Sequence, residues 1–513
     1  MSLSAPMFTS VANPFGAPIT RARLTEIENS YPGGFWNATP PLQKIAAEAA
    51  AKRVSPVGVL TLLQEHRATH VPPNVVLVQT DGTCGMVLGD GTSLNGFTSI
   101  VSRPGGGKTV TFKVATALSP HIGVACPDGT SQGIVRHLAK TVTRTKDEEG
   151  KPLPAPVQET VFHTHAVMVH APEIGTLNAE FERSGSKTAP MMRSMWIGET
   201  VGMNNGESER KVIIPPNMAR ICGAWGVHPV KAVAILAQAD EGTPQRFVWA
   251  PAKEIRTPAP ARKPAPQGVS FPMPEFTPPG NTAFGSTDMP PTIDLKDPVY
   301  PEPIWVHWSP QMKVDIAAFR AAEDALYDRE PYAIRTPEQA DAEQALLMRS
   351  HFLLTTIKSA VKMGWLHGRA NPSDLDWELA KIQMLVSEAE LAGAWFECSQ
   401  VPVALAKLVG EMRAVEQVTA EAHRELLKDA AMTAVEEEIF TDLCKGPKTM
   451  RDIKRRFRRQ PLKEKLANKA VENLIGTKRV EWEEQTQPTG GRPSSGFYWA
   501  VVDGVRLGDG LDA

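Results

Sequence analysis

The sequence predicts an α/β fold in which a parallel sheet covered by helices precedes a helical domain and a small C-terminal domain. Short apolar segments alternate with helical ones between residues 74 and 252, and this alternation is typical of a parallel sheet covered on both faces. One apolar segment leads directly into a glycine-rich stretch, IVSRPGGGKTVTF, at 100–112. A chain of 513 residues has room for about two to four domains.

The composition narrows the class of protein. The net charge is −2, with 42% hydrophobic and 22% charged residues, so any nucleic-acid surface must be local. The five cysteines are far apart and show no CxxC or metal-ligand spacing, which indicates a reducing interior. No signal-peptide pattern and no run of 18 apolar residues is present, so we expect no membrane association.

The first 73 residues are expected to form an arm and a helical region. Residues 1–34 are rich in Pro, Gly, Ser and Thr and are predicted to be an N-terminal arm. Residues 35–73 contain two expected helices, at 38–53 and 55–66. The second is predicted to begin with Ser55 as N-cap and Pro56 at its first helical position.

The core is predicted to span residues 74–252. Its helices are expected directly after the glycine-rich stretch, from Ser131 to about 142, and from His228 to about 239; the charged segment 143–156 reads as a surface excursion. The expected strands are 74–80, 84–90, 97–102, 121–125, 166–171, 219–227 and 245–251.

The remainder of the chain divides into three expected parts. Residues 253–305 are dense in proline and are predicted to be an extended connector. Residues 306–430 are predicted to form a helical lid domain with long helices at 346–368 and 371–396, the latter capped by Ser373. Residues 434–503 show three short helices followed by two strands, the arrangement of a winged helix.

The glycine-rich stretch is close to the phosphate-binding pattern G-x-x-x-x-G-K-[ST], although Ser102 replaces its first glycine. The backbone N–H groups of such a loop surround phosphates, Lys108 would reach them, and Thr109 would bind Mg²⁺. A glycine-rich turn without a ligand is the alternative, but an apolar strand before the loop and a helix-length segment after it favour a nucleotide site. The predicted nucleotide-binding residues are Ser102, Pro104, Gly105, Gly106, Gly107, Lys108 and Thr109.

A phosphate-binding loop of this kind needs an acid at the end of a neighbouring strand. Glu173 follows the strand predicted at 166–171, although Pro172 stands where an Asp is usual. We therefore expect Glu173 to act on Mg²⁺ and on the attacking water; a carboxylate that only begins a helix is the alternative. Arg246 lies at the start of the last predicted strand and is a candidate finger for the phosphate of a neighbouring subunit, or a surface arginine.

Several motifs together resemble a family of P-loop ATPases from actinobacteria and actinophages, encoded among the replication genes of phages and mobile elements. The motifs are FWNATPPLQKIAAEAAAKRVSPVGVL, the loop itself, MWIGETVG, GVHP, EGTPQRFVW and SAVKMGWLHGRANPSDLDWELA, within residues 35–395. The resemblance implies a RecA/AAA+-like core related to hexameric replicative helicases, with ATP and Mg²⁺ as cofactors. It assigns His228 to phosphate sensing, and relatives often carry an acid where this chain has Gln132.

Two regions are candidates for DNA contact. The segment 198–218 is expected to be a hairpin lining a central pore, with Arg210 and Lys211 on the phosphate backbone; an exposed polar hairpin is the alternative. In the winged helix the basic residues are Lys454, Arg455, Arg456, Arg458, Arg459 and Arg492. Acidic Glu481, Glu483 and Glu484 leave protein contact as the alternative there. Lys358 is a further candidate for reaching the nucleotide from the lid, or a helix-surface lysine.

The expected function is that of an ATP-hydrolysing, ring-forming DNA helicase or translocase in phage or mobile-element replication. We expect a homo-oligomer, most simply a hexamer, that acts with other replication proteins in the cytoplasm of a bacterial host. Two alternatives stay open: an ATP-dependent helicase loader or remodeller, and a non-catalytic origin-binding protein that uses ATP only to assemble. Gln132 and Pro172 favour the second alternative.

Overall fold

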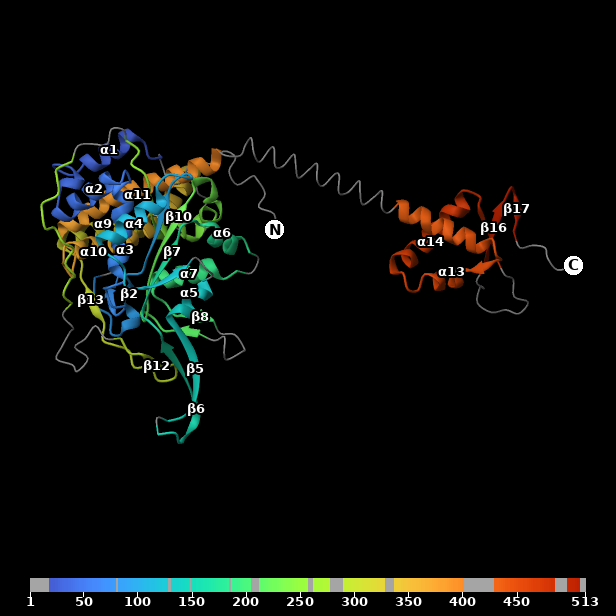
Figure 1. The fold of residues 1–513 in the computed structure, drawn as a ribbon, viewed down its shortest axis with the longest axis horizontal. Helices are drawn as coiled ribbons and strands as arrows, with labels where there is room; N and C mark the ends of the chain where they lie inside the picture. The colour runs from blue at the N-terminus through green and yellow to red at the C-terminus, as the bar shows by residue number, and fades with distance from the viewer. Residues whose placement is uncertain are drawn as a thin grey trace. The chain divides into compact units, whose positions relative to one another are not determined.

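The structure is a computed structural model that describes residues 18–79, 82–127, 131–147, 149–183, 186–203, 212–256, 262–276, 289–327, 336–400, 429–484 and 496–507. The chain divides into two compact units, Met1–Pro402 and Val403–Ala513, which are drawn in Figure 1. We describe each unit separately.

The first unit is built on a five-stranded, entirely parallel sheet, as the sequence predicts. The strand order is β11-β3-β10-β7-β4. Every residue of β3, β10 and β11 is buried, because helices cover both faces of the sheet. The strands are β3 (Gly96–Val101), β4 (Val124–Pro127), β7 (Ala166–Ala171), β10 (Arg220–Val227) and β11 (Phe247–Pro251).

Alternate side chains of these strands enter two hydrophobic cores. On β10, Cys222 and Ala224 lie in a core with helices α2 (Pro40–Ala51), α3 (Pro56–Ala68) and α4 (Lys108–Leu118). Ile221 and Trp225 lie in the other core. Its helices are α5 (Ser131–Leu138), α6 (Gly175–Glu182), α7 (Thr188–Ile197) and α8 (Val233–Leu236). The period of two along a strand therefore sets which core each residue joins.

The N-terminal residues that the structure describes are packed against the body of the unit. Helix α1 (Arg21–Asn29) follows Ile19, whose backbone N–H donates to the carbonyl of Ala389 at 2.9 Å. Glu28 is buried and pairs with Arg256 at 2.8 Å. Residues 18–34 are thus part of the core rather than an arm, whereas residues 1–17 of the predicted arm lie outside the described residues. The two following helices are confirmed, with Ser55 at the N-cap position and Pro56 first in α3.

The predicted strand at 84–90 is wrong. This segment ends in a 3₁₀ turn, η3 (Leu88–Asp90), and a carboxylate oxygen of Asp90 accepts hydrogen bonds from the backbone N–H groups of Met86 (2.6 Å) and Val87 (3.0 Å). An Asp side chain that caps its own loop competes with strand pairing. The short strands around it are β1 (Val75–Leu77) and β2 (Thr92–Ser93), and β1 also pairs in parallel with β13 (Ile304–Val306).

A long two-stranded ribbon is inserted in the sequence between β4 and β7, which are paired with each other in the sheet. Strands β5 (Ala139–Lys146) and β6 (Pro152–Phe162) pair antiparallel, and Figure 1 shows them projecting from the unit. The end of the predicted helix at 131–142 and the predicted surface excursion at 143–156 are therefore strands. A second pair, β8 (Val201–Met203) and β9 (Val212–Ile214), forms the stem of the predicted hairpin, and its tip lies outside the described residues.

Parts of the predicted connector join the fold. Strand β12 (Thr292–Asp294) pairs with β6, and β13 pairs with β1. Helices α9 (Pro310–Tyr327), α10 (Pro337–Leu366) and α11 (Asp374–Gln400) follow, and Ser373 caps α11 through a 3.4 Å bond from Asp376 N–H to its hydroxyl. Residues of α10 and α11 share one hydrophobic core with α3 and β3. These helices are thus not set apart from the sheet as a separate domain.

The second unit combines helices with a small antiparallel sheet. A helical segment at 429–443 precedes β14 (Lys448–Thr449), α13 (Met450–Arg456) and α14 (Pro461–Gly476). The sheet has the order β14-β16-β15, formed with β15 (Val480–Glu483) and β16 (Phe497–Val502), and β17 (Val505–Arg506) pairs with β16. Its core includes Ile439, Phe457 and Leu474. Across the described parts of both units, no helix is both long enough and apolar enough to span a membrane.

Candidate nucleotide-binding site

The glycine-rich loop lies at the carboxyl ends of the parallel strands, where open α/β sheets bind ligands. It leaves β3 at Val101 and enters α4 at Lys108. The backbone N–H of Ser102 donates to the carbonyl of Val227 at 2.9 Å, which ties the start of the loop to the end of β10. The strand, loop and helix that the sequence predicts are therefore present in the expected order.

The glycines are required by the conformation of the loop. Gly105 and Gly107 have φ angles of +74° and +91°, which side-chain-bearing residues rarely adopt. A Cβ atom on Gly106 would lie 2.6 Å from the Oγ of Ser102. The altered first position is thus occupied by a small residue in tight contact with a glycine, and the loop keeps the side-chain-poor surface on which phosphates bind.

Lys108 begins α4 and points back over the loop. Its Nζ donates to the carbonyl of Ser102 at 3.1 Å. Desolvation lowers the pKa of Lys108, Lys231 lowers it further, and the carboxylate of Glu173 opposes the shift. Thr109 is exposed at the first turn of the helix, where the N-terminal end of the helix dipole also favours an anion.

Glu173 lies beside the loop at the end of β7. A Cβ atom on Gly226 of β10 would lie 2.0 Å from the carbonyl oxygen of Pro172 and 3.0 Å from the Cδ of Lys108. Only glycine at position 226 therefore allows the ends of β7 and β10 and the side chain of Lys108 to meet. The carboxylate of Glu173 is 66% exposed and lies 3.9 Å from the Nζ of Lys231, so it is accessible to a ligand in the loop.

His228 lies at the end of β10, next to the loop. Its Nδ1 accepts a hydrogen bond from the backbone N–H of Val230 at 3.2 Å, which leaves the proton on Nε2 in the neutral ring. Desolvation lowers the pKa of His228, and the positive charges of Lys108 and Lys231 lower it further. At neutral pH the ring is therefore uncharged and can donate one hydrogen bond from Nε2.

Three charged residues of the site were not identified from the sequence. Lys231 ends a 3₁₀ turn, η5 (Pro229–Lys231), directly after His228. Arg103 in the loop forms an ion pair with Glu397 of α11 at 3.3 Å, and Cys398 donates to the carbonyl of Pro229 at 3.0 Å. The position of Lys231 after a strand end was a usable signal. Glu397 had none, because α11 is brought to the loop only by the tertiary fold.

The structure places Arg246 and Lys358 away from the loop, at the amino ends of the strands. Arg246 precedes β11 and is only 7% exposed, and its guanidinium donates to the carbonyl of Glu241 and lies over the ring of Trp196. Lys358 is fully buried, donates to the carbonyls of Asn95 and Trp196, and lies 3.5 Å from the centroid of the same ring. The expectation that Lys358 reaches the nucleotide is wrong, and the burial of Arg246 gives no support to a finger.

The structure describes only some of the residues that the sequence predicts to bind DNA. Arg210, Lys211 and Arg492 lie outside the described residues. On and after α13, Lys454 is half-buried, and Arg456 pairs with Asp442 at 2.6 Å. The exposed members of this basic cluster are Arg455, Arg456, Arg458 and Arg459. Of the three acids that weaken the DNA interpretation, Glu481 and Glu483 pair with Arg506, at 2.7 and 2.9 Å.

The site is suited to Mg²⁺ only when phosphates are present. Within the described ranges, no group of three or more His, Cys, Asp or Glu side chains could hold a metal ion. Thr109 and Glu173 could supply two ligands, and Mg²⁺ commonly takes the rest from phosphate and water. Gln132, in the first turn of α5, is exposed and cannot replace a missing acid.

Comparisons with known proteins place no constraint on these assignments. No model of a protein family matches the chain, and no curated protein is significantly similar to it.

Proposed function

We propose that the first unit binds ATP in the loop 102–109 and hydrolyses it. The observation that carries the proposal is the convergence of four groups at the carboxyl ends of three adjacent parallel strands. The loop and Lys108 follow β3, Glu173 follows β7, and His228 follows β10. A side-chain-poor loop with a lysine, a carboxylate and a neutral hydrogen-bond donor is the set that phosphoryl transfer to water requires.

Each residue has a separate role in this proposal. The backbone of Gly105–Gly107 and the charge of Lys108 bind the phosphates, and Thr109 and Glu173 hold Mg²⁺ between them and the phosphates. The ion would neutralise charge on the phosphate oxygens. Glu173 orients the attacking water and accepts its proton, and the Nε2–H of His228 donates to a terminal phosphate oxygen.

We extend the proposal to the class of ATPase, the domains and the biological role of the chain. We interpret the first unit as a RecA/AAA+-like ATPase with α9–α11 in the role of a helical lid, and the second unit as a winged helix. By the resemblance of its motifs, the chain would be a ring-forming DNA helicase or translocase of a phage or mobile element, acting with other replication proteins in a bacterial cytoplasm. Supporting features are the exposed arginines around α13 and the pairing of two of the acids at the base of the predicted wing with Arg506.

A second candidate is an ATP-gated assembly protein that binds an origin of replication or loads a helicase but turns over little ATP. The burial of Arg246 favours it, because a finger acting on a neighbouring subunit needs an exposed guanidinium. The second candidate is also favoured by Gln132 and Pro172, which stand where an acid is usual.

ATP hydrolysis by the full chain, with and without single-stranded DNA, tests the proposal. Lys108→Ala should abolish turnover and ATP binding in the loop, whereas Glu173→Gln should keep ATP bound in the loop and lose turnover. Lys313→Ala, at an exposed lysine of α9, is the matched control and should behave as wild type. Binding without turnover in the wild type would shift the assignment to the assembly protein.

The DNA-binding part of the proposal has its own test. Replacing Arg455, Arg458 and Arg459 by Ala should weaken duplex binding and flatten its salt dependence, because each lost phosphate contact reduces the slope of log K against log[salt] by about one. Fluorescence anisotropy with labelled duplexes of unrelated sequence measures both. An unchanged slope would favour a protein partner for this unit.

A further inference from the structure

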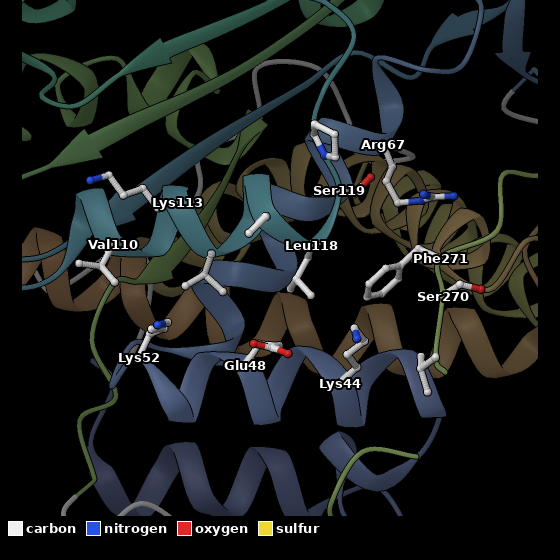
Figure 2. Close-up of a pocket in the computed structure, with 14 residues that line it drawn as sticks. Lys44, Glu48, Lys52, Arg67, Val110, Lys113, Leu118, Ser119, Ser270 and Phe271 are labelled. Atoms are coloured by element: carbon white, nitrogen blue, oxygen red, sulfur yellow. The ribbon is translucent and has the colours of Figure 1, made fainter. Parts of the chain in front are cut away.

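A second pocket lies beside the proposed nucleotide site, on the other side of α4. It has a volume of about 750 Å³ and lies between α2, α4 and the segment 269–271, within the range of small-molecule sites. Figure 2 shows α4 and α2 as two opposite walls, with Phe271 and Arg67 at one end and Lys52 and Val110 at the other. Because Val110 is two residues beyond Lys108, this second end is close to the glycine-rich loop.

The pocket has an excess of positive charge that the described residues do not neutralise. The pocket is lined by Lys44 of α2, by Lys52 directly after this helix, by Lys113 of α4 and by Arg67, against a single acid, Glu48. No ion pair of any of these five groups is found in the described parts of the chain. An anion is the complement of such a lining.

Arg67 is the one of these charged groups that is buried. Its residue is only 3% exposed. One nitrogen, Nη2, donates to the carbonyls of Pro272 (2.5 Å) and Trp365 (3.4 Å), while Nε has no partner among the described residues. Burial lowers the pKa of Arg67 to about 10. Neutral carbonyls do not balance a guanidinium charge, and a buried charge without a counter-ion is unfavourable.

Apolar side chains make up most of the remaining lining, together with Ser119 and Ser270. Val110 is 40% exposed although it is a large aliphatic residue on a core helix, and Val114, Leu118 and Phe271 continue the same surface. In Figure 2 the ring of Phe271 extends into the pocket toward Leu118. A flat apolar body could pack against these side chains while its charged end faces the lysines and Arg67.

We infer that this pocket binds a small phosphorylated aromatic molecule of the nucleotide class, at a site separate from the glycine-rich loop. The aromatic base packs between Phe271 and the aliphatic side chains of α4, and the phosphates pair with Lys44 and Arg67, while Lys113 adds to the positive charge around the pocket. A ligand in this pocket would contact α4, the helix that begins with Lys108. Binding could therefore modulate the proposed ATPase through this helix.

Equilibrium dialysis of the full chain against radiolabelled ATP tests the inference by counting sites. Wild type should bind two molecules per chain. Lys108→Ala should remove one, the double variant Lys44→Glu/Lys113→Glu should remove the other, and the triple variant should bind none. Lys113 is exposed and Lys44 is half-buried. Neither residue belongs to the hydrophobic core, so reversing their charge does not threaten it; Lys313→Glu is the control.

The two proposals fail in different ways in this experiment. One molecule per wild-type chain, lost in Lys108→Ala and kept in the double variant, overturns the pocket and leaves the loop site standing. One molecule lost in the double variant and kept in Lys108→Ala overturns the loop site and supports the pocket. No binding, or binding unchanged in all variants, overturns both.

Discussion

Arg103 in the glycine-rich loop forms an ion pair with Glu397 on α11, with 3.3 Å between Nη2 and Oε2, although 294 positions separate the two residues. The side chains are 74% and 35% exposed, so water screens the pair and its contribution to stability is small. The pair matters because of its position. The carboxylate of Glu397 binds an arginine of the loop that we propose to bind phosphates.

Glu397→Gln should therefore tighten ATP binding. The substitution frees Arg103 for the phosphates and removes a negative charge that repels them, an effect of about 1 kcal/mol, or roughly fivefold in Kd. Isothermal titration with ATP measures it. Glu378→Gln, which removes a paired surface acid of the same helix, should leave the affinity unchanged, and an unchanged affinity in Glu397→Gln would show that Arg103 is not restrained by the pair.

The buried pair between Glu65 of α3 and Lys362 of α10 predicts a large loss of stability. The Nζ of Lys362 lies 2.7 and 2.8 Å from the two carboxylate oxygens, and the side chains are 2% and 4% exposed. Lys362→Met leaves Glu65 as an unpaired buried charge and should lower the free energy of unfolding by about 3–5 kcal/mol. The double variant Glu65→Leu/Lys362→Met should lose less than this single variant.

Urea unfolding followed by tryptophan fluorescence tests this pair. The control is Lys381→Met on α11, which removes a lysine that is 36% exposed and pairs with Asp315 and should cost less than about 1 kcal/mol. If Lys362→Met and Lys381→Met were equally mild, the interpretation of the buried pair would be wrong.

Glu390 of α11 predicts a stabilising substitution with a defined pH dependence. Burial raises the pKa of Glu390 from 4.5 to about 8, and the charge of Glu397 adds to the shift. The unfolded chain therefore loses this proton from about pH 4.5 upward, while the folded chain keeps it until about pH 8. Below pH 4.5 the ionisation of Glu390 thus contributes nothing to the free energy of unfolding. Between pH 4.5 and pH 8 it lowers this free energy increasingly.

Glu390→Gln should consequently stabilise the fold by several kcal/mol at pH 9 and hardly at all at pH 4. Chemical unfolding of wild type and variant at a series of pH values gives the difference directly. A difference that did not grow between pH 4.5 and pH 8 would contradict the raised pKa.

The projecting ribbon predicts a gain of self-association when its prolines are replaced. The backbone groups of Gln158, Thr160 and Phe162 face β12. Beyond the end of β12, where a register shift interrupts the pairing of β6 with β5, the strand carries Pro152, Pro154 and Pro156. Proline has no N–H to donate, so this free edge is a poor template for another strand. Pro154→Thr/Pro156→Thr should increase oligomer content in sedimentation velocity, whereas Pro266→Thr, in the described part of the connector, should not.

The sequence predicted the sheet because its strands carry a strong local signal. The strands at 97–102, 166–171, 219–227 and 245–251 agree with the structure to within one or two residues, since each is a short apolar segment bounded by polar or turn residues. The ribbon was missed because its charged and proline-rich residues are typical of loops, and the strand that pairs with its outer edge, β12, is more than 130 residues away.

The candidate site was predictable only where it is local. Ser102–Thr109, Glu173 and His228 each follow a strand, and parallel strands bring their carboxyl ends to one edge of the sheet. Glu397 could not be found, because it comes from a helix that follows the sheet by more than a hundred residues. Lys358 was misjudged because a basic residue in a sequence gives no sign of a buried aromatic partner such as Trp196. The contact of Arg246 with the same ring was equally hidden in the sequence, and its role as a finger stays a prediction.

The most direct test of the central claim is the affinity of the full chain for ATP in the presence of Mg²⁺, measured by equilibrium dialysis for wild type, Lys108→Ala and Lys313→Ala. The three proteins are also compared with the substitutions Lys44→Glu/Lys113→Glu added to each of them as a background, because these substitutions remove the proposed second site and leave only the loop site to be counted. In that background, we predict one molecule of ATP per chain, lost in Lys108→Ala and kept in Lys313→Ala. ATP binding in that background that does not depend on Lys108, or no binding at all, would contradict the assignment of the loop as a nucleotide site.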